Sequence, residues 1–279
     1  MQLHDFKYLL AILLFTALAK PVVAKQLKYQ MKCDLGKDAA QTQRANGSTI
    51  ILAPSATTCR VSVVDVNNKL VFGYTAPGIQ VYVGAGPTGG TVDAVIQADT
   101  FNPYRLFIVS LGEHPRLLGE LDNKYGMWLQ DSCGNGPEIW TSDDAFQGDP
   151  DLMDVYHNDV YVPDVVFVLS KQHFVDATAS CRSYFDKEIA MLRSQLRGDD
   201  IEEFRSGRIK DSFHRGRVKG YILKIVFCYL YTGQQAKAKR VIADMWPYDD
   251  QERVWNSILK LRSEGVLRQT ELKQPATTP

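Results

Sequence analysis

The sequence predicts an α+β protein, in which an N-terminal antiparallel β-meander (a sandwich or partial propeller) is followed by a C-terminal helical bundle. Up to about residue 175, short segments rich in β-branched residues alternate with turn signals about every 8 to 12 residues, which is typical of all-β architectures. Beyond that point, apolar residues recur at spacings of three or four, the period of an amphipathic helix. Acidic loops between residues 131 and 163 precede the last predicted strand, after which the helical pattern begins.

Residues 1–24 are predicted to be a signal peptide. The apolar run at 8–19 is about 12 residues long, whereas a membrane-spanning helix needs about 20. Val22 and Ala24 supply the small residues of a cleavage site, although an uncleaved anchor is the alternative. No later segment is long and apolar enough to cross a membrane, so we expect a periplasmic or secreted protein with a β-rich domain at 25–175, a helical domain at 176–268 and a disordered tail at 269–279.

The charge balance argues against nucleic acid as a partner. Lysine plus arginine equals aspartate plus glutamate over the 279 residues, so the formal net charge is zero. The basic residues between 205 and 219 fit the solvated face of a helix. We therefore expect a protein or glycan partner in the cell envelope.

The β-meander is predicted from strands and turns in succession. Asn67 and Asn68 form a two-residue turn between Val-rich arms at 59–66 and 69–74. The glycine-rich stretch at 84–90 is interpreted as a hairpin loop, because it lacks the lysine and hydroxyl of a phosphate-binding loop. Residues 34–45 are polar and are predicted to form a loop. The remaining strands are predicted at 26–32, 48–53, 79–83, 91–97, 104–111, 116–121 and 164–170.

The helical part is predicted from apolar stripes and capping residues. Residues 173–176 are expected to lead into a first helix, with Asp176 or Thr178 as its cap, and 198–200 to end it. A longer helix is expected at 212–231 with Gly233 at its C-terminus. A further helix should run to Trp246, and a last one from 249–250 to 264.

Five cysteines suggest disulfide bonds in an oxidising compartment. Cys228 lies in an apolar helical run and is predicted to be free and buried. The other four allow three pairings. Pairing Cys33 with Cys59 and Cys133 with Cys181 keeps each bridge between neighbouring segments and is preferred, but the other pairings stay open.

Residues 131–138 carry the densest set of metal-type ligands. Asp131 and Asn135 occupy alternate positions before Gly136, and Glu138 follows. The stretch resembles the FG-GAP calcium loop of integrin-like propellers and related bacterial exported proteins, and this resemblance implies that Asp131 and Asn135 are side-chain ligands. The chain departs from that pattern, because Cys133 stands where an oxygen ligand is expected and the acid follows the glycine by two residues instead of three.

Two interpretations of this loop follow. Asp143 and Asp144 could complete a calcium site with Glu138, although no cofactor is required by any motif. Alternatively the segment is a turn held by Asx-type hydrogen bonds and by a disulfide through Cys133.

The helical part carries a second resemblance. Residues 229–242 resemble one tetratricopeptide-type helix pair, in which Gly233 makes the tight turn and Ala236 and Ala238 allow close packing. Several stacked units are needed for a solenoid with a peptide-binding groove, and the chain has one.

The functional expectation is a non-enzymatic exported protein that binds a partner. A hydrolase is the alternative, with Asp144, Asp154 and His157 acting as general acid and base in an acidic cleft. A third alternative is an accessory subunit of an envelope complex that makes contact through its helices.

Overall fold

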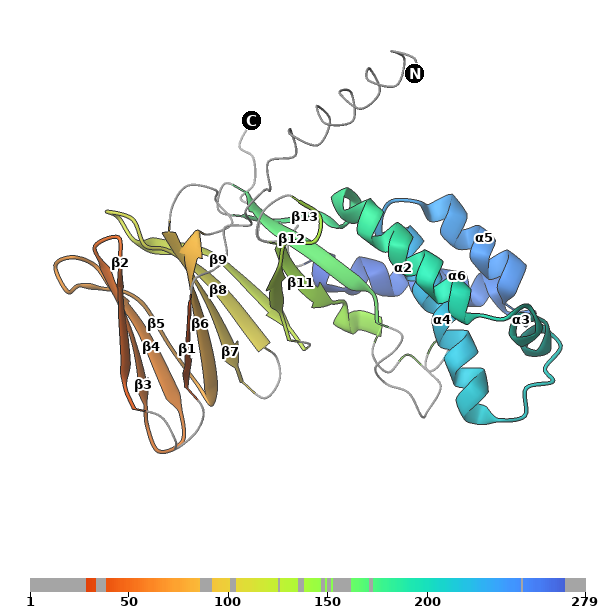
Figure 1. Ribbon diagram of the computed structural model, residues 1–279, viewed down its shortest axis with the longest axis horizontal. Helices are drawn as coiled ribbons and strands as arrows, with labels where there is room; N and C mark the ends of the chain where they lie inside the picture. Colours follow the sequence, from red (N-terminus) through yellow and green to blue (C-terminus); the bar gives the residue numbers. More distant parts are fainter. Residues whose placement is uncertain are drawn as a thin grey trace, which may run out of the picture.

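The computed structural model describes residues 29–33, 39–85, 92–100, 104–124, 126–134, 138–146, 149, 152, 162–170, 173–246 and 248–268. It confirms the α+β class. The sheets and then the helices follow one another along the long axis of the molecule (Figure 1). The predicted signal peptide and C-terminal tail lie outside the described residues. No helix within these ranges is both long and apolar enough to cross a membrane.

The first nine strands form two antiparallel sheets. The outer sheet has the order β2-β3-β4-β5 and comprises β2 (Gln41–Ala45), β3 (Ser48–Pro54), β4 (Cys59–Val64) and β5 (Leu70–Ala76). The central sheet has the order β1-β6-β7-β8-β9 and comprises β1 (Tyr29–Cys33), β6 (Gly78–Ala85), β7 (Val92–Asp99), β8 (Tyr104–Ser110) and β9 (Arg116–Asn123).

These two sheets pack face to face as a sandwich. Ile50 and Val61 of the outer sheet share one buried cluster with Val81 and Ile96 of the central sheet. Alternate residues of each strand point into this core, which is the pattern expected for a strand with one buried face. Within the described residues the strands form neither a closed barrel nor a propeller.

The central sheet is buried on both faces in β8. Phe107 and Val109 belong to the sandwich core, whereas Leu106 and Ile108 belong to a second core that extends towards the helices. Because successive side chains point to opposite faces, a strand between two cores must be apolar at every position. This explains the uninterrupted apolar run in β8.

A third antiparallel sheet connects the sandwich to the helices. Its order is β10-β11-β12-β13, with β10 (Trp128–Gln130), β11 (Glu138–Ser142), β12 (Asp164–Ser170) and β13 (His173–Asp176), and the 3-10 helix η1 (Asp144–Phe146) follows β11. At Gly119 of β9, an added Cβ atom would lie 2.9 Å from the ring of Phe174 on β13. The absence of a side chain at Gly119 therefore allows the third sheet to approach the central one.

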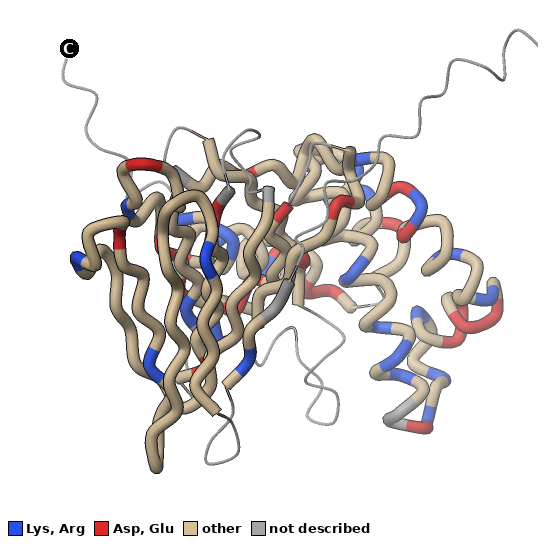
Figure 2. The backbone as a smooth tube through the Cα atoms, turned by 60° about the vertical axis from the view of Figure 1, so that its left-hand side comes forward, with Lys and Arg blue, Asp and Glu red and all other residues tan. Residues whose placement is uncertain are grey.

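The C-terminal helices cover the third sheet. They are η2 (Thr178–Cys181), α2 (Arg182–Gln195), α3 (Gly198–Arg205), α4 (Ser212–Tyr231), α5 (Gln235–Met245) and α6 (Gln251–Glu264). Trp140 of β11 packs against Tyr184 and Phe185 of α2, with ring centroids 4.8 and 5.9 Å away. The third sheet and the helices thus share one core. Charged residues recur along the helices, whereas the strands of the sandwich carry few (Figure 2).

Three local predictions were wrong. Part of the predicted loop at 34–45 forms β2, whose central side chains are exposed, so its backbone pairing with β3 and not side-chain burial holds it in place. Residues 173–176 pair with β12 as β13 instead of leading directly into a helix. Residues 198–200 do not simply end a helix but begin α3, because Asp200 accepts the backbone N–H of Arg197 at 3.2 Å.

The predicted turn at Gly233 was confirmed, with a φ of 77° at the C-terminus of α4. The β4–β5 hairpin is also present, with a φ of 59° at Asn68, but its connection spans residues 65–69 instead of two residues. Asparagine and glycine are the residues that most readily adopt this left-handed conformation.

Candidate functional site

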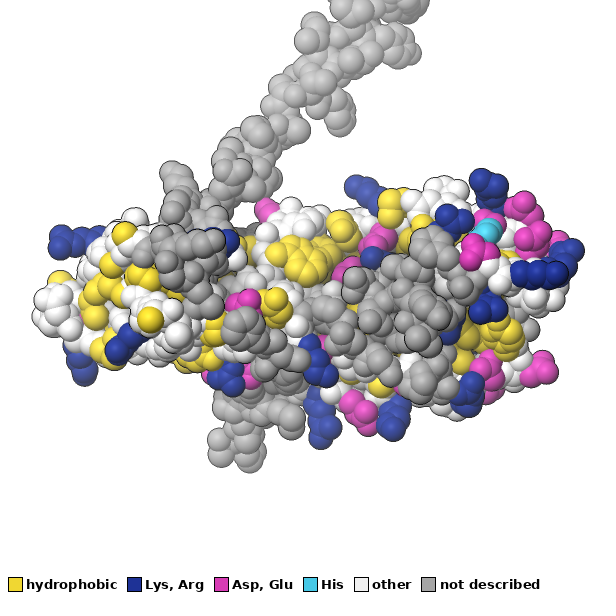
Figure 3. Space-filling model, turned by 90° about the horizontal axis from the view of Figure 1, so that it is seen from below, with side chains coloured by type: hydrophobic (Ala, Val, Ile, Leu, Met, Phe, Trp, Pro, Cys, Tyr) yellow, Lys and Arg dark blue, Asp and Glu magenta, His cyan; other side chains and the backbone are white. Residues whose placement is uncertain are grey.

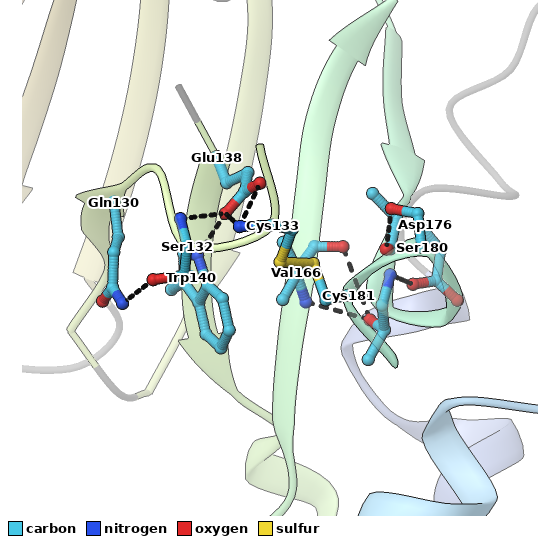
Figure 4. The surroundings of a disulfide bond; sticks show 11 residues. Gln130, Ser132, Cys133, Glu138, Trp140, Val166, Asp176, Ser180 and Cys181 are labelled. Atoms are coloured by element: carbon cyan, nitrogen blue, oxygen red, sulfur yellow. Dashed lines mark hydrogen bonds between the residues drawn. A yellow bond between two sulfur atoms is a disulfide. The ribbon is translucent and has the colours of Figure 1, made fainter. Parts of the chain in front are cut away.

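Both preferred disulfide bonds are confirmed. Cys33 of β1 is bonded to Cys59 of β4, which joins the central and outer sheets. Cys133, in the loop after β10, is bonded to Cys181 at the end of η2 (Figure 4). Cys228 is free and buried in α4, as predicted. The second bond fastens the 131–138 loop to the start of the helical region.

Glu138 closes that loop from inside. Its side chain is fully buried, and its carboxylate accepts the backbone N–H of Ser132 at 3.0 Å and of Cys133 at 3.1 Å. The indole Nε1 of Trp140 donates a third hydrogen bond at 3.1 Å (Figure 4). Three N–H donors thus converge on one buried carboxylate, and these hydrogen bonds fix the loop.

Of the predicted metal ligands within the described residues, Glu138 alone belongs to a group of potential ligands. Among the described residues, the group of potential ligands that comes together is Cys133, Glu138 and Cys181, whose ligand atoms lie within 4.8 Å of one another. Both cysteines are in the disulfide, and thiolate is the form that binds a metal. Asp131 is exposed, and Asn135 lies outside the described residues. Calcium binding by this loop stays a prediction.

Asp143 connects three elements. Its buried carboxylate accepts the hydroxyl of Tyr231 on α4 at 2.7 Å and the backbone N–H of Val266, beyond α6, at 3.1 Å. It also accepts the N–H of Ala145 at 3.2 Å. Burial raises the pKa of Asp143, although these three donors act in the opposite direction. A Cβ atom on Gly265 would overlap the Asp143 carboxylate, so glycine is required there.

The carboxyl group of Asp144 lies apart from these contacts, where it accepts the backbone N–H of Lys124 at 3.4 Å. Asp154 and His157, its partners in the hydrolase alternative, lie outside the described residues. That alternative stays a prediction.

The sequence did not predict a partly buried ionic cluster. Lys224 of α4 places its Nζ 2.8 Å from Glu188 of α2 and 3.6 Å from Asp164 of β12. Ser142 donates a 3.2 Å hydrogen bond to Asp164. Burial raises the pKa of Asp164; burial also acts to lower the pKa of Lys224, but the two carboxylates prevail and raise it. A lysine inside the apolar run at 221–230 was the available signal.

One end of the sandwich gathers several turns, and we call it the loop end. Thr49 and Val64 are partners in the β3–β4 pairing, so the β2–β3 and β4–β5 turns lie at the same end. Ser48 donates a buried 3.4 Å hydrogen bond to the carbonyl oxygen of Leu111, which places the β8–β9 turn beside them.

The loop end exposes aliphatic side chains. Val66 is 72% exposed, Leu70 51% and Leu117 42%, and these are three of the seven large hydrophobic residues that are exposed in the described part of the chain. β5, which begins with Leu70, contacts β9, which carries Leu117, across the margin of the sandwich. Val66 and Leu70 therefore mark one region of the surface, and Leu117 lies at the margin of the neighbouring sheet, at the same end of the sandwich.

The turn that carries Val66 is held rigidly. Oδ1 of Asp65 accepts the backbone N–H groups of Asn67 and Lys69, each at 2.8 Å. The N–H of Asn68 also donates to the carbonyl oxygen of Asp65 at 3.0 Å. Such an Asx turn fixes the hairpin tip without help from other elements.

The geometry therefore separates buried polar groups from an exposed apolar end. The oxygens of Glu138 and Asp143 already accept hydrogen bonds, and the charges of the Lys224 cluster neutralise one another in part. Comparison of the chain with protein-family models, with curated proteins and with solved structures found no match.

Proposed function

We propose that this is an exported, non-enzymatic binding protein that contacts a protein or glycan partner in the cell envelope through the loop end of its sandwich. The observation that carries the proposal is the exposure of Val66, Leu70 and Leu117 on a rigid frame. The predicted signal peptide and the two disulfide bonds support export, because structural disulfides are rare where thiols are kept reduced.

Single exposed hydrophobic residues are common, whereas a group of them rimmed by polar residues is typical of interaction sites. Here the rim is supplied by Lys69, Glu113 and Arg116, all exposed. The space-filling view looks at the opposite end of the sandwich, where hydrophobic side chains also reach the surface (Figure 3). A preorganised turn lowers the entropy lost when a partner binds, which favours recognition by this hairpin.

Site-specific photo-crosslinking in the producing cell tests the proposal. A photoreactive amino acid is placed at Val66 or Leu70, and at Met191 of α2 as the control, because Met191 and Leu70 are both 51% exposed. We expect a discrete adduct from the loop end and none from Met191. Fractionation of the same cells should find the crosslinked protein outside the cytoplasm and without residues 1–24.

The opposite pattern would separate the alternatives. An adduct from Met191 but not from Val66 would favour the accessory subunit that makes contact through its helices. Cytoplasmic protein that retains residues 1–24 would contradict export.

A further inference from the structure

We propose that the partner is a protein that contributes an extended segment, which pairs as an additional strand with the open edge of β5. The inference rests on the proposed function, because it names the partner class and the binding mode at the same end of the sandwich. Strand addition uses main-chain hydrogen bonds for affinity and alternate side chains for specificity.

β5 has an edge that no described strand occupies. It is the last strand of the outer sheet and pairs antiparallel with β4 on one side. Every second residue of an edge strand directs its N–H and C=O groups outwards, where another chain can bond to them. The described residues supply no backbone hydrogen bond to the outer side of Leu70–Ala76.

The composition of β5 distinguishes it from the other edges. Proteins protect edge strands with charged residues, prolines, β-bulges or very short strands. The pairing of β5 with β4 has one such irregularity, where Val64 pairs with Leu70 and Val63 with Phe72, so the regular part of the edge is Phe72–Ala76. Over seven residues, β5 has neither a charge nor a proline. Each other edge strand of the three sheets is protected: β2 carries Arg44, β1 Lys32, β9 Arg116, Glu120 and Asp122, and β13 Asp176, while β10 has three residues.

The side chains beside this edge suit a peptide better than a glycan. Val66, Leu70 and Leu117 are aliphatic and offer no aromatic face on which a sugar ring can stack. The aromatic rings of β5 are directed elsewhere, because Phe72 and Tyr74 pack against Phe107 with centroids 5.0 and 4.6 Å away. Aliphatic contacts beside open backbone groups are what a β-strand of another protein requires.

Charge sets the direction of the added strand. Near the other end of β5, the Arg105 guanidinium lies 5.9 Å from the centre of the Tyr74 ring. It is 3.4 Å from Glu120 and 3.4 Å from Asp122, and all three side chains are partly exposed. Two carboxylates beside one guanidinium favour a basic residue of the partner strand at this end, and the exposed side chain of Leu70 favours an aliphatic residue at the other.

A designed peptide tests the inference on the purified mature protein. The probe has about eight residues, begins with lysine and continues with valine or isoleucine alternating with threonine, so that antiparallel pairing places the lysine near Arg105. Control peptides begin with glutamate or carry N-methyl groups on alternate backbone amides. We expect the probe to slow hydrogen exchange of the alternate amides of β5, and N-methylation to weaken binding at least about tenfold.

Matched variants link the peptide to the edge. Leu70→Lys should weaken binding of the probe about tenfold, whereas Met191→Lys, at equal exposure, should leave it unchanged. Circular dichroism and melting show that each variant is folded. Strand addition would be overturned if the N-methylated peptide bound as tightly as the probe, or if no peptide bound. It would also be overturned if the probe slowed hydrogen exchange at sites other than β5.

The outcomes also distinguish this inference from the proposed function. If Val66 forms crosslinks but the β5 amides are not protected from hydrogen exchange, the proposed function is supported and strand addition is contradicted. Dimers that protect β5 without peptide would show that a second copy occupies the edge, and would likewise overturn the inference. Loss of the Val66 crosslinks themselves would overturn both.

Discussion

The hydroxyl of Tyr231 donates a 2.7 Å hydrogen bond to Oδ2 of Asp143, although 88 residues separate them in the chain. Both side chains are buried. Since Oδ1 of Asp143 accepts the N–H of Val266, one carboxylate links the end of β11 to α4 and to the turn after α6. Burial raises the pKa of the Tyr231 hydroxyl well above its usual range, so it stays a donor over the neutral range.

Removing that donor should destabilise the fold. In Tyr231→Phe the buried carboxylate of Asp143 loses one partner, which costs about 1 to 3 kcal/mol. Urea unfolding followed by tryptophan fluorescence measures the loss. Tyr229→Phe is the control, because Tyr229 is partly buried, its ring centroid lies 5.5 Å from Nζ of Lys237, and its hydroxyl has no hydrogen-bond partner among the described residues. Equal stability of the two variants would contradict a structural role for the bond.

The Asp143 carboxyl group should also make stability depend on pH. Burial raises its pKa above the ordinary value of 3.8, so the folded state binds the proton more tightly than the unfolded chain. The contribution of this carboxyl group to the free energy of unfolding is complete at pH values below its ordinary pKa. It is lost as the pH rises through the raised pKa of the folded state. The stability of the wild type relative to Asp143→Asn should therefore fall as the pH increases above 4. A difference that stays constant from pH 4 to 8 would refute this.

The sequence predicted the features that depend on local pattern. Alternating apolar residues and turn signals predicted most strands. Asn68 and Gly233 indicated turns, because asparagine and glycine readily adopt the left-handed backbone conformation. The disulfide pairing could be preferred because neighbouring segments tend to pack together. β2 escaped detection because its side chains are largely exposed, so only its pairing partner reveals it.

The polar contacts of the interior could not be predicted. Asp143 looked like one more acidic loop residue, since nothing local shows that Tyr231 and Val266 will surround it. Lys224 is conspicuous as a lysine in an apolar run, but its partners Glu188 and Asp164 come from two other elements and could not be identified from the sequence. Such contacts depend on how the third sheet meets the helices. That packing is a tertiary property with no periodic signal in the chain.

The Cys133–Cys181 bond should contribute to the stability of the helical region. The two residues are 48 positions apart, and closing a loop of that size restricts the unfolded chain. Replacing both cysteines by alanine should lower the free energy of unfolding by about 2 to 4 kcal/mol. Replacing Cys33 and Cys59 is the comparison, because that bond lies within the sandwich. The near-ultraviolet circular dichroism of Trp140 should change when Cys133 and Cys181 are replaced and stay unchanged when Cys33 and Cys59 are replaced. That result would support a role of the Cys133–Cys181 bond in the helical region.

Calcium binding at the 131–138 loop has a direct thermal test. If the ion binds as the loop resemblance implies, calcium should raise the melting temperature of the protein and a chelator should lower it. Glu138→Gln should remove the difference, because it takes away the buried carboxylate of the predicted ligand set. Identical melting in calcium and in chelator would contradict the metal hypothesis and leave the loop as a structure closed by Glu138 and the disulfide.

The Lys224 cluster should be more important for stability than surface ion pairs. Lys224→Met leaves Glu188 and Asp164 as two largely buried carboxylates without their cation, and Oε2 of Glu188 already lacks a hydrogen-bond partner among the described residues. The expected loss is about 1 to 3 kcal/mol, less than for a fully buried pair because the lysine is 26% exposed.

Arg240 provides the matched control for this cluster. It pairs with Asp244 on the exposed face of α5, where both side chains are largely in solvent. Arg240→Met should therefore change the free energy of unfolding by less than about 0.5 kcal/mol. The Lys224→Met loss should also shrink at acidic pH, because burial raises the pKa of Asp164 and its protonation removes one unpaired charge. Equal effects of the two substitutions in denaturant titrations would show that the cluster is no stronger than a surface pair.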